Sequence, residues 1–247
     1  KRIVAVLDEA FEGLARARAN AEANLADARE LLESISTSAF HAGAQGWREA
    51  SLGEVADFRN GLNFTRASKG QRIKIVGVGD FQTNRQVPVE SLTEVVIDGE
   101  LAQDDQLRSG DVLAVRSNGN KALIGRVMLV PETTEVISFS GFTIRVRLRT
   151  ADILPGYLLE FMRSPRIRET LTSGGGGSNI SNLNQGQLSR LRIEFPSSKD
   201  DQRLILDRID AAVEAVGDLQ RQVESQQRDL NALRQSLLQK AFAGELT

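Results

Sequence analysis

The sequence of 247 residues contains no cysteine, one histidine and only five prolines. Without cysteine there can be no disulfide framework, no thiolate metal site and no cysteine nucleophile. The single histidine, His41, excludes a histidine-rich metal cluster. None of the five prolines is followed by another, so the Asn-Pro-Pro-aromatic tetrapeptide of DNA methyltransferases is missing. These absences argue against an enzyme.

Long apolar runs are missing as well. Uninterrupted apolar stretches extend over only a few residues, whereas a membrane-spanning helix needs about 20. No signal-peptide pattern opens the sequence. We therefore expect a cytoplasmic protein with no membrane partner. The first residue is Lys1 and not methionine, which suggests that the numbering starts inside a longer or processed protein.

Two glycine-rich segments resemble cofactor loops only in part. Residues 77–80 read Gly-Val-Gly-Asp but lack the third glycine and the following amphipathic helix of a dinucleotide loop. Residues 174–177 are four glycines without the lysine and hydroxyl residue of a phosphate-binding loop. The first segment suits a strand end and turn. The second suits a flexible loop that orders on contact with DNA or a partner, or a plain connection. We expect this chain to bind no cofactor.

The sequence does contain a long internal repeat. Residues 1–40 align with residues 203–242 without a gap at a constant offset of 202, and ten positions are identical. The identical pairs include Ile3/Ile205, Asp8/Asp210, Leu31/Leu233 and Phe40/Phe242. Roughly 160 residues of different composition separate the two copies. This order of helix, globular insert and matching helix indicates that the helices act as a spacer and that the insert is the globular functional part.

Both copies carry apolar residues alternately three and four positions apart, which is the 3.5-residue period of a coiled coil. At 1.5 Å per residue each helix would extend roughly 60 Å, close to two turns of B-DNA. The line of these apolar positions along each helix is the expected seam of the pair, and Asn24 and Gln226 occupy equivalent positions in it. A buried amide there could fix the register of the pair, or it could be tolerated without functional gain. We expect the two helices to pair as an antiparallel coiled coil.

Three regions follow from the repeat: residues 1–42 as the first spacer helix, 43–200 as a globular domain, and 201–247 as the second spacer helix. The overall net charge of −2 divides unevenly, because each helical copy carries about −2 and the insert about +2. A difference this small permits DNA binding on one face without arguing for it.

The insert is predicted to be a mixed α/β domain, so the fold class is α+β. Strand-like runs bounded by glycine, asparagine and aspartate occur at residues 73–78, 112–116, 124–130, 142–148 and 191–195. Helices are predicted at residues 155–162, 165–171 and 185–190, each of the first two opening with a proline. A polar loop spans residues 172–184, and the second long helix starts at residues 200–202.

Five blocks carry a resemblance to a known family. They are WREASLGEVADFRNG (47–61), LRSGDVLAVRSNGNKALIGRV (107–127), ISNLNQGQLSRLRIEFP (180–196), DQRLILDRID (201–210) and LRQSLLQKAFAGELT (233–247). In these blocks the chain resembles the specificity subunits of Type I restriction–modification systems. Such subunits usually contain two target-recognition domains that alternate with two conserved helices. Here one recognition domain lies between two helices, as in a half-length subunit or the C-terminal half of a full one.

The resemblance implies a non-catalytic, sequence-specific DNA-binding subunit that reads one half of a bipartite double-stranded target. It implies docking of methyltransferase (M) subunits, which use S-adenosylmethionine, and of a restriction/translocase (R) subunit, which uses ATP. Phe40 and Phe242, at equivalent helix ends, are the predicted docking residues. A natural half-subunit would pair as a homodimer. The alternative is a coiled-coil structural adaptor whose insert binds protein; a stand-alone methyltransferase fragment is disfavoured by the missing motifs.

Three polar loops of the insert supply side chains that can read bases. Arginine suits guanine, asparagine and glutamine suit adenine, and serine reaches either. The residues are Arg59, Asn60, Asn63, Arg66 and Lys69 in the first loop, Arg116, Ser117, Asn118, Asn120 and Lys121 in the second, and Ser178, Asn179, Asn182, Asn184 and Gln185 in the third. The alternative for each is that asparagine, serine and glycine populate turns for backbone reasons.

Overall fold

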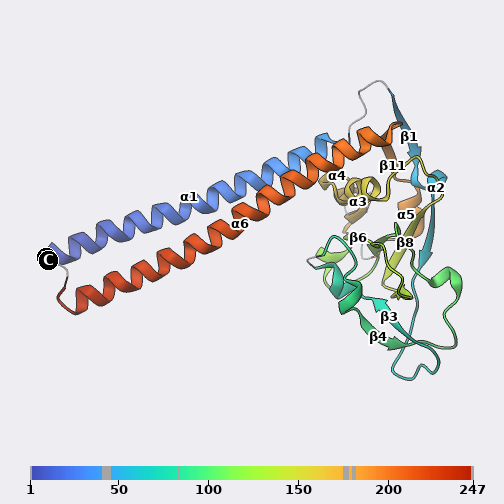
Figure 1. Cartoon of the computed structure of the whole chain (residues 1–247), viewed down its shortest axis with the longest axis horizontal. Coiled ribbons are helices and arrows are strands. Elements are labelled where there is room, and N and C mark those ends of the chain that lie inside the picture. The colour runs from blue at the N-terminus through green and yellow to red at the C-terminus, as the bar shows by residue number, and fades with distance from the viewer. Residues whose placement is uncertain (1, 41–45, 83, 175–177, 180–181, 246–247) are drawn as a thin grey trace. The chain divides into compact units, whose positions relative to one another are not determined.

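The structure is a computed structural model that describes residues 2–40, 46–82, 84–174, 178–179 and 182–245. The chain divides into two compact units, one formed by residues 1–35 with 207–247 and the other by residues 36–206. The first unit is a pair of long helices and the second contains the β-sheets (Figure 1). This confirms the predicted α+β fold. The two long helices are α1 (Arg2–Ser38) and α6 (Lys199–Phe242).

Helices α1 and α6 run antiparallel within the helical unit (Figure 1). Arg29 Nη2 donates a hydrogen bond to Gln220 Oε1 at 3.0 Å. Further along, the guanidinium of Arg234 lies over the ring of Phe11, 5.3 Å from its centroid. Residue numbers therefore fall along one helix as they rise along the other, and the antiparallel pairing is confirmed.

The repeat in the sequence is matched by burial in the helix pair. Ala21 and Val223 are only 7% and 5% exposed, and they occupy equivalent positions of the repeat because 21 + 202 = 223. A small side chain on one helix and a larger one on the other allow the two backbones to pack closely at this level. Both copies therefore bury the same position of the shared pattern.

The predicted polar layer of the seam is wrong by one residue. Asn24 and Gln226 are exposed, whereas the residues that follow them, Leu25 and Gln227, are half-buried. An α-helix has 3.6 residues per turn, so positions counted every 3.5 residues move gradually around the helix surface and away from the partner helix. After several turns the following residue faces the partner instead. Gln227 Nε2 donates to Glu22 Oε1 at 3.0 Å. The polar contact at this level is therefore an exposed hydrogen bond and not a buried pair of amides.

Two β-sheets form the centre of the globular unit. One has four antiparallel strands in the order β2-β8-β5-β6, and the other has three in the order β4-β3-β7, with β3 and β7 parallel. The strands of the first sheet are β2 (Ala56–Asn60), β8 (Thr143–Leu148), β5 (Val112–Val115) and β6 (Val127–Leu129). Those of the second are β4 (Thr93–Val96), β3 (Arg72–Val76) and β7 (Ile137–Phe139).

The main core cluster contains residues from both sheets. Leu113 and Met128 from the four-stranded sheet share this cluster with Val76 and Phe139 from the three-stranded sheet, and each is at most 1% exposed. All four residues of β5 are buried, so this strand is covered on both faces. Helix α3 (Pro155–Arg163) contacts β5 and β6. A continuous Val-Leu-Ala-Val run suits a strand in this position.

Helix α3 (Pro155–Arg163) buries six consecutive residues, 157–162, and α4 (Pro165–Thr172) follows it directly. Proline at the first position of α3 fits because its missing N–H has no helical acceptor there. Tyr157 Oη donates to Glu194 O at 2.8 Å and joins α3 to β11 (Arg192–Pro196). A two-stranded antiparallel sheet combines β1 (Trp47–Ser51) with β11 (Arg192–Pro196).

The first residues of α6, up to Leu206, belong to the globular unit, where they contain a buried amide. Gln202 is 0% exposed. Its Nε2 donates to Asp152 O at 2.7 Å and to Pro196 O at 2.9 Å, and its Oε1 accepts from Leu154 N at 2.8 Å. Every hydrogen-bonding atom of this side chain is therefore used inside the protein.

Smaller elements complete the unit. They are α2 (Leu52–Val55), α5 (Gln185–Ser189), β9 (Ser173–Gly174), β10 (Ser178–Asn179), and the 3-10 helices η1 (Val78–Phe81), η2 (Val89–Ser91), η3 (Gln103–Asp105) and η4 (Lys121–Leu123). The predicted strand at residues 124–130 is shorter, because Gly125 adopts a φ of +77° between η4 and β6. No strand had been predicted for β1, β2, β4 and β7. Most of the glycine run, residues 175–177, lies outside the described residues.

No helix in the described part of the chain is long and apolar enough to cross a membrane.

Candidate nucleic-acid interface

Three connecting segments meet at one end of the four-stranded sheet, where two strands end and a third begins. β2 ends at Asn60, β5 ends at Val115 and β8 begins at Thr143. Thr143 pairs with Val115, and its neighbour Ile144 pairs with Asn60. The segments after β2 and β5 and the turn before β8 therefore lie side by side, although they are far apart in the sequence.

The turn before β8 holds the first two loops together. Gly141 N donates to Leu62 O at 2.7 Å, which ties the turn to the loop after β2. Arg116 N and Ser117 N both donate to Phe142 O, at 2.9 and 3.4 Å. The backbone of this turn therefore bridges the first and second predicted DNA-binding loops.

A close backbone approach and one further hydrogen bond complete the cluster. A Cβ atom on Gly61 would lie 2.3 Å from Ser140 O, so only glycine allows the first loop to pass this close to the turn. Leu183 N donates to Arg116 O at 2.7 Å, which brings the third loop to the second. Parts of all three predicted loops thus meet at one edge of the sheet, and we call this region the loop cluster.

Phe142 lies in the loop cluster and is 61% exposed. The sequence had placed this residue at the start of a strand, but β8 begins one residue later, so Phe142 belongs to the turn. An exposed aromatic ring among polar loops can contact a thymine methyl group or wedge against a base step. Sequence reasoning missed this residue, because an apolar residue that precedes a strand carries no signal of exposure.

The predicted residues of the first loop lie in three different places, the first two being the strand and the loop cluster. Arg59 and Asn60 lie in β2 and not in a loop. Arg59 Nε donates to Asp105 Oδ1 at 2.6 Å, and this hydrogen bond raises the pKa of Arg59. Asn63 reaches the loop cluster, since its Oδ1 lies against Gly141. Asn63 is therefore better placed to contact a DNA base than Arg59, whose guanidinium is already hydrogen-bonded to Asp105.

Arg66 and Lys69 belong to a different part of the surface. Lys69 N donates to Asp98 Oδ1 at 3.0 Å, and Gly70 forms a parallel bridge with Gly99. These contacts attach the segment to the end of β4. Both side chains are exposed, but among the described residues no hydrogen bond joins them to the loop cluster. Their contact with DNA stays a prediction.

The second loop uses two of its asparagines to shape the backbone. Asn118 Oδ1 accepts from Asn120 N at 2.7 Å, and Asn120 Oδ1 accepts from Ala122 N at 3.1 Å at the start of η4. This supports the backbone explanation for both residues, while their amide NH₂ groups can still donate. Asn120 and Lys121 are exposed and Asn118 is half-buried.

The third loop leads into a capped helix. Asn184 and Gln187 form a reciprocal capping box at the start of α5, with both hydrogen bonds at 2.9 Å. Gln185 is the first helical residue, and Asn182 is exposed. Asn179 lies in β10, and its contact with DNA stays a prediction. The backbone role accounts for Asn184, and Asn182 remains available for a base.

The arginines inside β8 serve the fold. Arg147 donates through Nε and Nη2 to the two carboxylate oxygens of Asp111, both at 2.7 Å. Arg145 is 6% exposed and donates to Asp104 O at 2.6 Å. Burial is the main cause that lowers the pKa of Arg145, and the neighbouring Arg147 adds to it. Both guanidinium groups are therefore held inside the globular unit, and Arg147 is paired there with a carboxylate.

The two predicted docking residues differ in accessibility. Phe40 is 6% exposed and packs edge-on against Tyr157 and Phe161, with ring centroids 5.2 and 5.8 Å away. It is a core residue of the globular unit, so the prediction of a surface role for Phe40 is corrected. Phe242 is 88% exposed, and its role in docking stays a prediction.

Residues 77–80 form the end of a strand and a 3-10 turn, as the sequence suggested. Gly77 follows β3, and its N–H donates to Asp80 Oδ2 at 2.8 Å, so the segment closes on itself. Within the part of the chain that the structure describes, no group of three or more histidine, aspartate or glutamate side chains is arranged to hold a metal ion.

The family and the fold of this chain have counterparts among known proteins. The family model of the Type I restriction modification DNA specificity domain matches residues 44–226. This match covers well over half of the chain, and the chain belongs to that family.

Two curated relatives are named specificity subunits. The chain is 27% identical over 207 residues to the Type I restriction enzyme StySPI specificity subunit of Salmonella potsdam, a match that covers 82% of this chain and 44% of that protein. It is 30% identical over 149 residues to the Type I restriction enzyme EcoKI specificity subunit of Escherichia coli K12, covering 58% of this chain and 31% of that protein. The matches therefore span less than half the length of either relative.

Solved structures with the same fold include a chain from work on complex assembly and conformational transition of the type I R-M system. It matches with a TM-score of 0.77 at 23% identity, over 99% of this chain and 59% of that one. The HsdS subunit from Thermoanaerobacter tengcongensis matches with a TM-score of 0.64 at 22% identity, over 99% of this chain and 58% of that one. At these identities the similarity defines the fold.

Proposed function

We propose that the globular unit binds one half of a bipartite double-stranded DNA target and reads its bases with the loop cluster. The observation that carries this proposal is the meeting of three loops, remote in sequence, around the exposed Phe142. Base recognition requires donors, acceptors and apolar groups that reach one stretch of a groove together. A rigid sheet edge that holds such loops satisfies this requirement.

Within the loop cluster we assign different roles to different side chains. Asn63, Arg116 and Asn118 supply amide and guanidinium groups of the kinds that pair with adenine and guanine. Phe142 supplies an apolar contact. Exposed cations such as Lys121 suit phosphates, which set the position of the protein along the duplex. The chain is a specificity component and not an enzyme, because the subunits it resembles recognise the target while partner subunits catalyse.

The helical unit is proposed to dock methyltransferase subunits, which bring S-adenosylmethionine, while a restriction/translocase subunit brings ATP. Leu31 and Leu233 are identical in the repeat, and both are exposed, at 61% and 49%. An exposed leucine at the same position of two related helices suits two equivalent contacts with copies of one partner. Such an assembly would work on DNA in the cytoplasm.

The second half of the target needs a second recognition domain. If a second copy of this chain supplies it, a two-fold arrangement presents the same surface twice and selects a symmetric target. If a different domain supplies it, the two halves of the target are unrelated. The paired helices are proposed to set the gap between the two halves.

Selection from a pool of randomised duplexes tests the proposal. The chain, alone and with its methyltransferase partner, is expected to enrich a short fixed sequence, and the symmetry of that sequence distinguishes a second copy from a different domain. Specific sites are typically bound 10³–10⁷ times more tightly than unrelated DNA, so enrichment should be strong. A pool that stays random under both conditions would leave the structural adaptor as the better account.

A further inference from the structure

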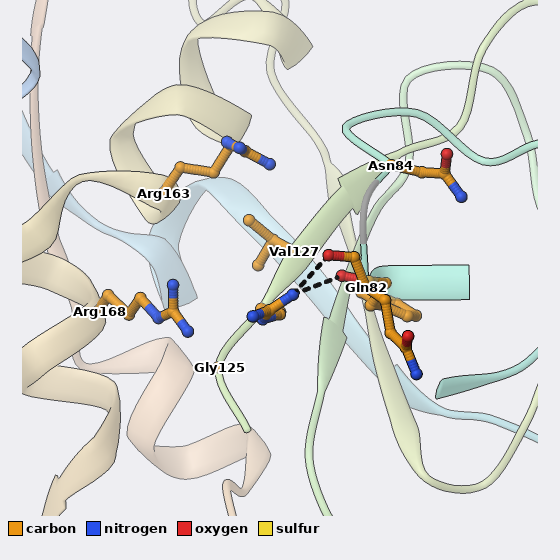
Figure 2. Close-up of a pocket in the computed structure, with 8 residues that line it drawn as sticks. Gln82, Asn84, Gly125, Val127, Arg163 and Arg168 are labelled. Atoms are coloured by element: carbon orange, nitrogen blue, oxygen red, sulfur yellow. Dashed lines mark hydrogen bonds between the residues drawn. The ribbon is translucent and has the colours of Figure 1, made fainter. Parts of the chain in front are cut away.

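Three arginines from separate elements line one pocket of about 250 Å³ in the globular unit. Arg126 directly precedes β6, Arg163 is the last residue of α3, and Arg168 lies in α4. Figure 2 shows the side chains of Arg163 and Arg168 on one side of the pocket and Gln82 on the other. None of the three arginines belongs to the predicted DNA-binding loops.

Arg126 is held in place by backbone carbonyls. Its Nη1 donates to Phe81 O at 3.2 Å and to Gln82 O at 2.7 Å, the two dashed lines in Figure 2. Its Nε is buried and has no hydrogen-bond partner among the described residues. A buried donor without a partner is uncommon in folded proteins, and among the described residues Arg116 Nε and Arg145 Nε share this feature. The pocket therefore contains a cation that is fixed in position but not fully satisfied.

The other two arginines add charge to the same volume. Arg168 Nη2 donates to Ala122 O at 3.0 Å, and a carbonyl does not neutralise a guanidinium. Arg163 Nε lies 3.7 Å from Glu160 Oε1, but that oxygen already accepts from Arg85 Nη2 at 2.6 Å. One carboxylate is thus shared by two arginines. Among the described residues neither Arg126 nor Arg168 forms an ion pair.

The pKa values of Arg163 and Arg168 are lowered mainly by burial and further by neighbouring positive charges. Burial lowers the pKa of Arg168, and the positive charge of Arg126 lowers it further. Burial also lowers the pKa of Arg163; Glu160 opposes this change, while Arg85, Arg168 and Arg126 reinforce it. An anion in the pocket would relieve the repulsion. The arginines remain charged in either case, because guanidinium does not lose its proton in proteins.

The size of the pocket and the type of its cations indicate the anion. A volume of 250 Å³ lies below the roughly 300–1,000 Å³ of pockets for drug-sized ligands, so a single phosphate group fits better than a whole nucleotide. Arginine forks match phosphate oxygens in pairs. The carbonyl that Arg168 binds belongs to Ala122 in η4, immediately after the second DNA-binding loop. One arginine of the pocket is therefore anchored to the segment that directly follows this loop.

We propose that Arg126, Arg163 and Arg168 form a phosphate-binding pocket that holds one backbone phosphate of the DNA whose bases the loop cluster reads. This inference rests on the proposed function. The pocket anchors the duplex without reading sequence, and it adds a contact outside the three loops. A free phosphate ion presents the same chemistry, and the experiment separates the two sources.

The test compares the double variant Arg163→Gln/Arg168→Gln with Arg166→Gln, which removes a cation from α4 outside the pocket. Binding is measured over a range of salt concentrations with a selected and an unrelated duplex. The double variant is expected to bind both duplexes roughly tenfold more weakly, and the slope of log K against log salt should fall by about 0.9, the value for one phosphate. Arg166→Gln should leave the slope within error of the unmodified protein.

A second arm identifies the phosphate itself. Single phosphates of the duplex are replaced in turn by neutral methylphosphonates. One position should weaken binding by the unmodified protein and have no further effect on the double variant, because both changes remove the same contact. Arg168→Lys keeps the charge and should retain most of the salt slope, which separates loss of charge from loss of folding. Thermal unfolding of every variant serves as the folding control.

Several outcomes would overturn the inference. An unchanged salt slope in a folded double variant removes the pocket from the DNA interface. If inorganic phosphate raises the unfolding temperature of the unmodified protein but not of the double variant, while DNA binding is unaffected, the pocket holds a free ion and not a DNA phosphate. Failure of the proposed function looks different, because the unmodified protein would then fail to discriminate between the two duplexes while the slopes could still be compared.

Discussion

Replacing Asp111 with alanine is expected to lower the free energy of unfolding by about 3–5 kcal/mol, the range for breaking a buried ion pair from one side. Asp111 is 1% exposed, and its carboxylate binds both Nε and Nη2 of Arg147 and also accepts from Arg108 N at 2.8 Å. The variant leaves the guanidinium of Arg147 largely buried, with a single hydrogen bond to Gln106 O.

Asp57→Ala is the matched control for this prediction. Asp57 pairs in register with Arg147 on the neighbouring strand, but its carboxylate bonds to Arg149 at 3.2 Å with both side chains about half exposed. Exposed pairs contribute about 0–1 kcal/mol. Urea unfolding of the three proteins is the measurement. Equal losses for Asp111→Ala and Asp57→Ala would mean that the buried pair does not stabilise the sheet.

Replacing Phe142 with alanine is expected to weaken binding to the selected duplex by roughly 10- to 100-fold, which corresponds to the cost of about one mismatched base pair. Affinity for an unrelated duplex should change by no more than about twofold, because phosphate contacts dominate that mode. Folding stability should change by about 0.5 kcal/mol or less, as for an exposed side chain. Titration of both duplexes with each protein gives the result.

Val136→Ala provides the comparison. Val136 is 50% exposed and directly precedes β7, whereas the turn that contains Phe142 follows this strand. The same kind of truncation at the far end of the strand should leave the affinity for both duplexes unchanged. If Val136→Ala and Phe142→Ala reduce specific binding equally, the loss reflects general surface truncation and the loop cluster is not the base-reading surface.

The positions and the antiparallel pairing of the two long helices could be predicted from the sequence, but the burial of Leu31 and Leu233 in their seam was predicted wrongly. The offset of 202 identified both helices, and the antiparallel arrangement is confirmed by contacts such as Arg29 with Gln220.

The position of the seam near Asn24 could not be predicted. A helix has 3.6 residues per turn while the apolar pattern repeats every 3.5 residues, and the sequence does not show at which residue this difference moves the buried face by one position. Ala21 and Leu25 carry the seam past that level.

In the globular unit, prediction succeeded where a strand has a continuous apolar run, as in β5. It failed for β2, whose sequence Ala-Asp-Phe-Arg-Asn is mostly polar. This strand forms because it pairs with β8 and because Arg59 forms a hydrogen bond with Asp105. The sequence alone does not indicate that contact. The side chain of Phe40 presents the same difficulty, since its burial depends on Tyr157 and Phe161 far along the chain.

The candidate site was predictable as a set of loops but not as a surface. Residues 116–121 and 182–185 were identified from composition, and the backbone hydrogen bond from Leu183 to Arg116 brings them together. Which asparagines shape the loops, such as Asn120 and Asn184, depends on hydrogen bonds that only the folded backbone defines. The arginine pocket was missed because its members come from three elements without a shared motif.

Photo-cross-linking from position 142 tests the central claim most directly. Benzoylphenylalanine replaces Phe142 in one protein and Val136 in another, and each is irradiated on the selected duplex. The account predicts that the protein modified at position 142 cross-links to a defined base within the fixed sequence, while the protein modified at position 136 gives no specific product. Cross-linking from position 136 but not from position 142, or at positions scattered along the duplex, would contradict the assignment of the loop cluster as the surface that reads DNA.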